Sequence, residues 1–414
     1  MKKVGLMAAC LLFLAGCQST EQTTNTSTKE SSPSADSQQV LQLSALEEFA
    51  LTSDVGQPKI TQEDQTWSVN EEESPLMKLF VEEIDSVKGS LIDKITGETQ
   101  FQLVLPEGTA SFAKDGDTWQ MAYQDQEYQL SNVGPLLQDF EGELFSGEAI
   151  GDPAGYQEIK IKEGNRNYRY TTKTTLSEVE QKPLVSGWFV QDHYQKAMSL
   201  NYDYANYLLS AIKDLRGTKV SDSDASEKLA VLRTLTFADD FTWQISKYED
   251  TYYLTDEKDQ LWQIPTAAGK LFTKPVFDSV DRFLMLIMAD ALDEVDITVG
   301  KTQHQVKATH ESNSNTFTLD DQDFLEADFR SLYQYIAVLS PEAEYQDQEI
   351  KSAASATITY LFTSNEKQEK RELAFYPLAD DESQLAVSID GKMDFITSQD
   401  QLDEMLSQLD NALK

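Results

Sequence analysis

The sequence predicts an α+β protein built from repeated antiparallel β-meander plus helix modules, with a helical connecting segment in the middle. Three observations lead to this prediction. Short segments with an apolar residue at every second position recur along the chain, which is typical of half-buried antiparallel strands. Tight polar turns separate them, and stretches with apolar residues at helical spacing follow them. Runs of strands followed by a helix favour α+β modules over βαβ crossovers.

Residues 1–16 have the features of an export signal. Lys2 and Lys3 precede an apolar stretch over residues 4–14. This stretch is shorter than the roughly 20 apolar residues that a membrane-spanning helix needs. Its length fits the apolar region of a secretory signal peptide, so we expect these residues to be removed on export.

The signal ends in Leu14-Ala15-Gly16-Cys17. This tetrapeptide resembles the lipobox of bacterial lipoproteins, which implies cleavage before Cys17 and attachment of a diacylglyceryl group to its sulfur. Two or more acyl chains anchor a protein stably in a bilayer. The alternative is a soluble secreted protein with a cysteine near its signal. The agreement of basic start, apolar stretch, box and polar continuation favours the lipoprotein.

A polar segment follows the lipidated cysteine over residues 17–40. It is rich in Ser, Thr and Gln and contains few apolar residues. Such a segment cannot bury enough surface to order itself, so we expect a flexible tether. The folded body would then lie close to the membrane, on its extracytoplasmic face, without being pressed against it.

The charge balance limits the partners of this protein. The chain has 34 basic and 71 acidic residues, a net charge of −37. Nucleic acid binding depends on clustered lysine and arginine, so this composition argues against it. Cys10 is lost with the signal, which leaves Cys17 as the one remaining cysteine. No disulfide is then expected in the folded region.

The N-terminal α+β region is predicted over residues 41–175. Alternating apolar positions indicate strands at Phe101–Leu105, Trp119–Tyr123 and Tyr128–Leu130. A helix is expected next, with its apolar face formed by Val133, Leu136, Leu137 and Phe140.

Residues 176–238 are predicted as the helical connection. Their pattern is more helical than that of the flanking regions. The expected buried positions are Trp188, Phe189, Tyr194, Tyr204, Leu208 and Ile212. Gly217 and the polar run 221–224 mark a break before the next region.

The C-terminal α+β region is predicted over residues 239–414. Asp390-Gly391 indicates a two-residue hairpin turn, because both positions of a type I′ turn need positive φ. Ser398 and Gln401 have the spacing of a capping box before a closing helix with Leu402, Met405, Leu406 and Leu409. A further helix is expected over Phe277–Ala291. Its run 283–289 is apolar on every side, which favours burial, with a partner-binding surface as the alternative.

The body resembles a family of bacterial envelope proteins, those that contain the domain of unknown function 4340. The segments that carry the resemblance are Thr242–Ile245, Glu294–Thr298, Leu385–Gly391 and Phe395–Ser398, together with the closing leucine helix. The resemblance implies repeated meander-and-helix units and a link to ABC-transporter components. It implies no functional residues.

The sequence offers no motif for catalysis, a cofactor or a metal. His304 and His310 lie six residues apart on one predicted strand, about 20 Å from end to end. His193 lies in a predicted helix without a neighbouring ligand motif. Gly300-Lys301-Thr302 lacks the first glycine of a phosphate-binding loop, and Ser364 with Lys367 falls in a predicted polar hairpin. The acidic run 320–323 does not match an EF-hand.

These observations predict a lipid-anchored extracytoplasmic protein that is not an enzyme. We expect an accessory or interaction component of an envelope complex, with an ABC transporter as one candidate. Its partners would be the bilayer, through acylated Cys17, and a membrane protein. The alternative is a solute-binding lipoprotein that captures a small ligand. Such receptors usually have two lobes of βαβ units, which the meander pattern disfavours.

Overall fold

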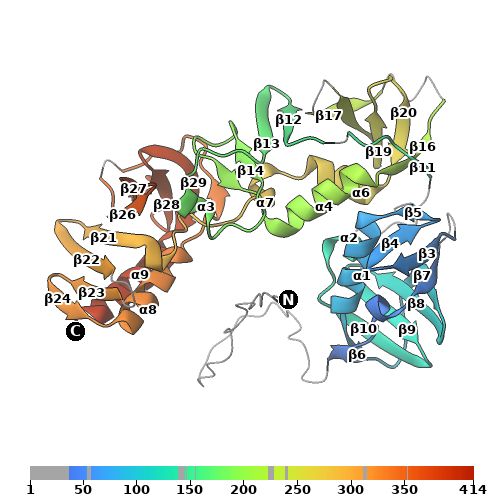
Figure 1. Cartoon of the computed structure of the whole chain (residues 1–414), viewed down its shortest axis with the longest axis horizontal. Helices are drawn as coiled ribbons and strands as arrows, with labels where there is room; N and C mark the ends of the chain where they lie inside the picture. Colours follow the sequence, from blue (N-terminus) through green and yellow to red (C-terminus); the bar gives the residue numbers. More distant parts are fainter. Residues whose placement is uncertain are drawn as a thin grey trace, which may run out of the picture.

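The computed structural model describes residues 37–53, 57–138, 145, 147–153, 155–221, 228–237, 241–310, 315–351 and 353–414. In this part of the chain, antiparallel strands form three sheets, and helices accompany each sheet. The predicted α+β class is therefore confirmed. The sheets follow one another along a bent body, with the main helices on the inner side of the bend (Figure 1).

The first sheet has ten strands in the order β1-β6-β10-β9-β8-β7-β2-β3-β4-β5. Its strands are β1 (Gln38–Gln39), β2 (Glu48–Thr52), β3 (Lys59–Glu63), β4 (Thr66–Val69), β5 (Glu72–Glu73), β6 (Lys88–Leu91), β7 (Glu98–Leu105), β8 (Gly108–Asp115), β9 (Thr118–Tyr123) and β10 (Gln126–Ser131). The 3-10 helix η1 (Leu43–Ala45) precedes β2, α1 (Pro75–Ser86) precedes β6, and α2 (Pro135–Gln138) follows β10. Of these strands, β7, β9 and β10 coincide with the three strands predicted for this region.

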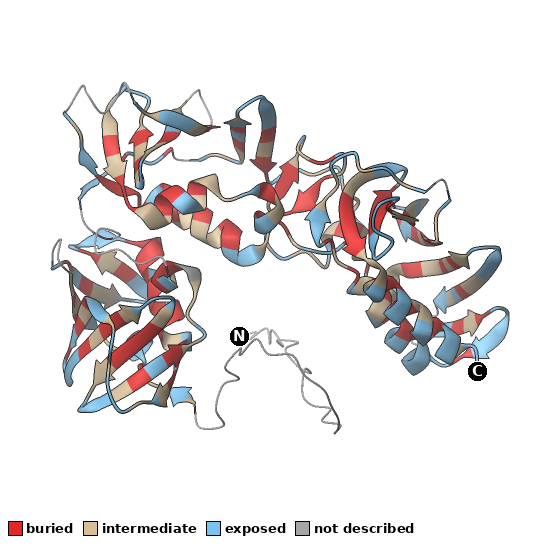
Figure 2. Ribbon diagram, turned by 180° about the vertical axis from the view of Figure 1, so that it is seen from behind, coloured by how far each residue is buried: buried red, intermediate tan, exposed pale blue. Residues whose placement is uncertain are grey.

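Helix α1 starts where its sequence specifies a start. Ser74 is the N-cap, its Oγ accepts a hydrogen bond from the Met77 amide at 3.0 Å, and a proline follows at the first helical position. The apolar face of α1, with Met77 and Phe80, is fully buried against the sheet. Figure 2 shows the same pattern in the other modules, where buried residues gather on the strands and on the helix sides that face them.

The second sheet also has ten strands, in the order β11-β16-β20-β19-β18-β17-β12-β13-β14-β15. Its strands are β11 (Glu148–Ala149), β12 (Glu158–Glu163), β13 (Arg166–Thr171), β14 (Phe189–Gln191), β15 (Met198–Ser199), β16 (Arg216–Lys219), β17 (Ala230–Thr236), β18 (Thr242–Tyr248), β19 (Thr251–Thr255) and β20 (Leu261–Ile264). Its helices are α3 (Glu178–Gln181), α4 (Tyr202–Lys213), α6 (Thr266–Thr273) and α7 (Val276–Ser279).

The third sheet has nine strands, in the order β24-β23-β22-β21-β26-β27-β28-β29-β25. Its strands are β21 (Leu292–Val299), β22 (Thr302–His310), β23 (Asn315–Leu319), β24 (Gln322–Phe324), β25 (Ala343–Glu344), β26 (Ala356–Ser364), β27 (Lys367–Pro377), β28 (Gln384–Ile389) and β29 (Lys392–Ser398). The 3-10 helix η4 (Ala289–Ala291) precedes β21, α8 (Glu326–Ala337) lies between β24 and β25 along the chain, and α9 (Gln399–Ala412) follows β29.

The helical connection predicted for residues 176–238 needs correction. This segment contains α3 and α4, but it also contributes β14, β15, β16 and β17 to the second sheet. Both predicted boundaries of the segment therefore fall inside that sheet. Three of these strands have only two to four residues, and so short a strand gives too few alternating positions for its period to show.

The helix predicted over Phe277–Ala291 is also wrong. Beyond α7, residues 283–288 are irregular and Ala289 begins η4, while α8 and the residues after it bind backbone groups of this run. The Leu284 amide donates to the Leu339 carbonyl at 3.1 Å, and the Tyr333 hydroxyl donates to the Ile287 carbonyl. Burial is confirmed for Leu284, Met285 and Ile287, whereas Phe283 and Met288 are partly exposed.

The C-terminal hairpin forms as predicted, but the capping box does not. Asp390 and Gly391 have φ of 51° and 81° and connect β28 to β29 as a two-residue turn. Ser398 is the N-cap of α9 but makes no capping hydrogen bond. Its hydroxyl donates to Glu342, and the Gln401 amide also donates to Glu342. Both side chains therefore hold the segment before β25 instead of capping α9.

The buried apolar residues form two main cores. One lies under the first sheet, whereas the other runs without interruption through the second and third sheets. Tyr194 and Phe395 join the latter two sheets, with ring centroids 4.9 Å apart. Tyr207 of α4 and Ala267 of α6 pack against the first core from outside. The first module is thus a separate hydrophobic unit that meets the second mainly through helices.

Glu83 lies at the centre of the helical contact between the first two modules. Its carboxylate accepts hydrogen bonds from the amides of Leu136 and Leu137 at 3.1 and 2.6 Å, and thereby caps α2. It also accepts a hydrogen bond from the Tyr207 hydroxyl of α4 at 3.1 Å. Gly134 permits this approach, because a Cβ there would lie 2.4 Å from the Glu83 carboxyl carbon. Burial raises the pKa of Glu83, although these three donors oppose the effect.

We expect Glu83→Gln to destabilise the first module by about 1–3 kcal/mol, because an amide accepts fewer and weaker hydrogen bonds than a carboxylate. The free energy of unfolding in urea would measure the effect. Glu82→Gln is the matched control, since Glu82 is exposed and forms just a weak surface ion pair with Lys78, at 3.9 Å. Equal stability of the two variants would contradict the role given to Glu83.

Candidate functional site: a cavity between the first and second modules

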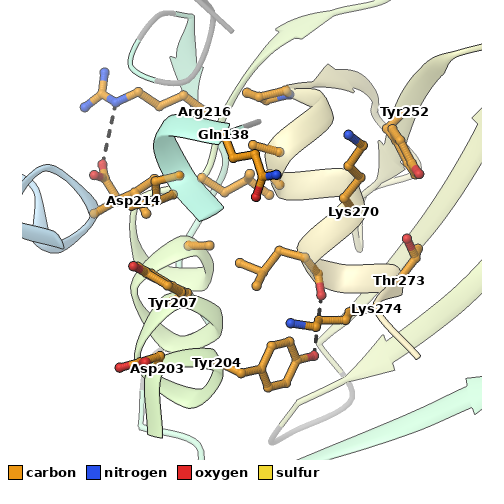
Figure 3. A pocket seen from close by; sticks show the side chains of 18 of the residues that line it. Gln138, Asp203, Tyr204, Tyr207, Asp214, Arg216, Tyr252, Lys270, Thr273 and Lys274 are labelled. Carbon is orange, nitrogen blue, oxygen red and sulfur yellow. Dashed lines mark hydrogen bonds and ion pairs between the residues drawn. The ribbon is translucent and has the colours of Figure 1, made fainter. Parts of the chain in front are cut away.

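A cavity of about 650 Å³ lies between the first two modules. Leu76 of α1 and Leu136 and Gln138 of α2 form one side, and residues of α4 and α6, with Arg216 of β16 and Tyr252 of β19, form most of the rest. Figure 3 shows α4 and α6 facing each other across the space. Ligand sites typically have volumes of roughly 300–1,000 Å³ and occur preferentially at domain interfaces.

The end of α4 is joined to the start of α1 at one wall of the cavity. The Ser74 hydroxyl, which caps α1, donates a hydrogen bond to Asp214, the C-cap residue of α4. Arg216 forms an ion pair with Asp214 at 3.6 Å and a closer one with Glu72 of β5. Because Glu83 and Tyr207 meet further along the same two helices, α1 and α4 run antiparallel.

Asp214 is the most perturbed acid of the cavity wall. Burial raises the pKa of its carboxyl to about 6, which outweighs the favourable contacts from Ser74 and Arg216. The carboxyl is therefore ionised at neutral pH at a cost to stability. Such a group can gain a proton under mildly acidic conditions.

The opposite wall carries basic and aromatic side chains. Lys270 and Lys274 lie four residues apart at the C-terminal half of α6, and both line the cavity. The Lys274 ammonium lies 5.6 Å from the centroid of the Tyr204 ring, a cation–π distance. The Tyr204 hydroxyl donates to the Leu271 carbonyl at 3.4 Å, which ties α4 to α6 (Figure 3).

A buried arginine fixes the end of α6 that carries these lysines. Arg233 of β17 is 1% exposed, and its Nη1 donates to the carbonyls of Phe272 and Lys274 at 2.9 and 3.1 Å. These carbonyls belong to the last turn and its cap, which have no partner within the helix. Glu163 forms an ion pair with Arg233 at 2.9 Å. The positions of Lys270 and Lys274 are therefore set by a buried, paired guanidinium.

A second charged cluster joins the second and third sheets. Glu180 of α3 is 3% exposed and accepts hydrogen bonds from both Arg371 of β27 and Lys196, all at 2.8 Å. Although burial opposes ionisation, these donors lower the pKa of Glu180 to about 2. The carboxylate is therefore charged at any physiological pH. It forms a structural ion pair and lines a cavity of only about 50 Å³.

His193 lies in the same junction and not in the predicted helix. It follows β14 in a bend, with its side chain 6% exposed and its Nε2 3.3 Å from Glu344 of β25. The Tyr194 hydroxyl donates to the same Glu344 oxygen at 2.8 Å. The aromatic environment of Tyr168 and Tyr194 surrounds the imidazole. This histidine thus contributes to packing between sheets.

The remaining sequence candidates lie in strands and turns of the third sheet or outside the described residues. Cys17, the predicted lipidation site, is outside them. His304 of β22 lies 2.8 Å from Asp320, and the His310 Nε2 lies 2.9 Å from the Leu292 carbonyl, so each has its own partners. Ser364 pairs with Lys367 across a hairpin. Within the described ranges, His, Cys, Asp and Glu form no group of three or more that could hold a metal.

None of the cavity residues was predicted from the sequence to belong to a functional site. In the sequence, Asp214 and Arg216 are charged residues close to the predicted break at Gly217. Their partners in the first module, Ser74 and Glu72, lie more than 100 residues away. The pair Lys270 and Lys274 could have been noticed, because two lysines at helical spacing are unusual in so acidic a chain. In the described part of the chain, no helix combines the length and hydrophobicity needed to span a bilayer.

Comparison with known proteins adds little to this description. No protein-family model matches the chain, and no curated protein matches it. One solved structure, a putative DNA polymerase III beta subunit from Eubacterium rectale, is 9% identical, and the alignment covers 86% of this chain and 91% of that one. Its TM-score is 0.14. A likeness of this size carries no argument about fold or function.

We expect the contribution of Asp214 to the free energy of unfolding to decrease as the pH rises from about 4 to about 6. The Asp214 carboxyl binds its proton more tightly in the folded state than in the unfolded state. The stability that this proton contributes is therefore complete below the ordinary pKa of aspartate and is lost as the pH rises through about 6. The rise in the pKa of Asp214 corresponds to a change on the order of 2–3 kcal/mol in the free energy of unfolding.

Asp214→Asn removes this titration, so its stability should fall less than that of the unmodified protein over the same range. Urea unfolding at pH 4 and pH 7 would measure the difference. Asp203→Asn, an exposed aspartate of the same helix, is the control. An identical pH dependence for all three proteins would exclude a buried titration at Asp214.

Proposed function

We propose that this chain is a lipid-anchored extracytoplasmic protein without enzymatic activity. We further propose that it acts as an accessory or interaction component of an envelope complex. The observation that carries the proposal is the motif Leu14-Ala15-Gly16-Cys17 at the end of a short apolar segment. The polar tether of residues 17–40 supports it, because a loose connection lets a folded body reach a neighbouring membrane protein.

We also infer that the three sheets are copies of one repeated module. The strand order of the second sheet equals that of the first when ten is added to each strand number. Read from β25 to β24, the third sheet has the order of the first sheet from β6 to β5 when nineteen is subtracted from each strand number, and in the described chain it has no equivalent of β1. In each module a twelve-residue helix, α1, α4 or α8, follows the first group of strands.

An array of such modules is suited to binding an extended partner. The modules form a bent body with α1, α4 and the helices of the third module on its inner side (Figure 1). Repeated units that are stacked in this way present long, continuous surfaces. The family resemblance implies that the partner belongs to a transporter, and this part of the proposal depends on the resemblance alone.

The second candidate function is capture of a small solute. The cavity between the first two modules favours it, because its volume and position are those of a ligand site. The two functions are compatible, since a lipid-anchored solute receptor also delivers its ligand to a membrane protein. An interaction component must bind a protein, whereas a solute receptor must bind a small molecule, so separate experiments distinguish the two functions.

Replacing the lipidated cysteine should release the protein from the membrane. We expect Cys17→Ala to move the chain from the membrane fraction to the soluble extracytoplasmic fraction, because unlipidated protein has no acyl chains to insert. Cell fractionation and metabolic labelling with a fatty acid would measure this. Cys10→Ala is the matched control, since Cys10 lies in the segment that cleavage removes. Unchanged membrane association of Cys17→Ala would contradict the anchor.

A partner should be recovered from the helix-lined side of the body. A photo-crosslinking residue at Tyr202, 50% exposed at the start of α4, is expected to capture a membrane protein in intact cells. The same residue at Val231 on β17, 55% exposed, is the control. Failure to recover a reproducible membrane protein at Tyr202, or equal recovery at both positions, would count against the proposed interaction.

A further inference from the structure

We propose that β24 and the start of α8 form the docking face for a protein partner that offers a basic side chain beside an apolar one. This inference deepens the proposed interaction function and rests on it and on the repeated modules. Asp323 and Leu325 flank the buried Phe324, so both point to the solvent side of the strand. Asp328 follows Leu325 at the spacing of one helical turn. Figure 1 shows β24 at the end of the body farthest from the first module.

The two internal junctions show how the equivalent position is covered elsewhere in the chain. β24 takes the place of β5 in the first sheet and of β15 in the second. After β5, the N-cap residue Ser74 donates its hydroxyl hydrogen to Asp214 of the second module. After β15, the N-cap residue Asn201 donates its amide hydrogen to the Ser279 carbonyl at 2.9 Å, just before the third module. In both cases, chain that follows the module covers the start of its helix.

Leu325 has the same position in the third module but no such cover. It is the N-cap residue of α8, makes no capping hydrogen bond and is 72% exposed. Because a leucine side chain cannot accept a hydrogen bond from the free amides of the first turn, it is a poor N-cap. The outer face of a terminal repeat is also normally polar. Burial of Leu325 against an apolar group of a partner would gain the free energy that its exposure forgoes.

The charge of the face determines what else the partner must offer. Residues 320–328 include five acidic residues and no basic one. Three of these acids have ion-pair partners within the module, whereas Asp323 and Asp328 have none in the described chain. At the first junction, Glu72 of β5 pairs with Arg216 of the next module. A basic side chain is therefore the complementary group, and such complementarity favours one partner over others.

The test places a photo-crosslinking residue at position 325 of the full chain in intact cells. Val338, 55% exposed at the other end of α8, is the matched control position. We expect a reproducible adduct with one membrane protein at Leu325, at least fivefold more abundant than at Val338. Mass spectrometry should find a lysine or arginine beside an apolar residue in the crosslinked peptide. No adduct, equal adducts at both positions, or an adduct with a second copy of this chain would overturn the proposal.

Removal of the two unpaired charges distinguishes specific docking from chance contact. Asp323→Asn combined with Asp328→Asn should reduce the adduct at position 325 at least fivefold. Asp410→Asn, at an exposed position of α9, is the matched control and should leave it unchanged. Circular dichroism checks that the double variant is folded. An adduct that a folded double variant retains in full would overturn the assignment of a basic partner.

A third variant tests Leu325 without a crosslinker. Leu325→Asn supplies a capping side chain, so the thermal midpoint of unfolding should stay the same or rise. The same substitution should lower at least fivefold the amount of the identified membrane protein that co-purifies with the chain. A lower midpoint with unchanged co-purification would assign Leu325 to packing within the chain and overturn its docking role.

Failure of this inference can be distinguished from failure of the interaction function. A membrane protein captured at Tyr202 but not at Leu325 would leave the interaction function standing and overturn the docking face alone. Capture at neither position would count against both.

Discussion

The antiparallel pairing of α1 with α4 is the contact on which the relation of the first module to the others depends. Two buried carboxylates hold it, Glu83 in the middle of the interface and Asp214 at its end. Each binds groups from both modules, so neither module satisfies these acids alone. Because polar hydrogen bonds have directional requirements that apolar packing lacks, they fix the relative position of the helices. The cavity lies beside this contact and is lined by residues of α1, α2, α4 and α6, among others.

The junction between the second and third modules is built differently. A continuous apolar core crosses it, and Glu180 is ionised between Arg371 and Lys196. Burying a charge without partners would cost several kcal/mol, and the two cations offset that cost. Burial raises the pKa of both carboxyls, but the two cations outweigh this effect at Glu180, whereas Ser74 and Arg216 do not outweigh it at Asp214. Mild acid can therefore protonate Asp214 at the first junction, whereas Glu180 at the second stays ionised.

The sequence predicted local structure better than long-range structure. The α+β class, three strands of the first module and the turn at Asp390-Gly391 follow from alternation and turn chemistry, which depend on neighbouring residues. The irregular run 283–289 could not be predicted, because its backbone partners lie in and after α8. The same limit applies to the cavity, since Ser74 and Asp214 are 140 positions apart. The predicted anchor at Cys17 depends on a local motif alone and stays a prediction.

The edges of the three sheets have a consequence for a protein held at a membrane. In the described chain, the outermost strands β1, β5, β11, β15, β24 and β25 have only two or three residues each. A long unpaired edge would offer a template for pairing with another chain. Anchored molecules diffuse in two dimensions and collide often, so such templates would promote intermolecular β-sheet formation. If the chain is anchored as proposed, short outer strands, together with strong mutual repulsion at a net charge of −37, would let many copies crowd one surface and stay separate.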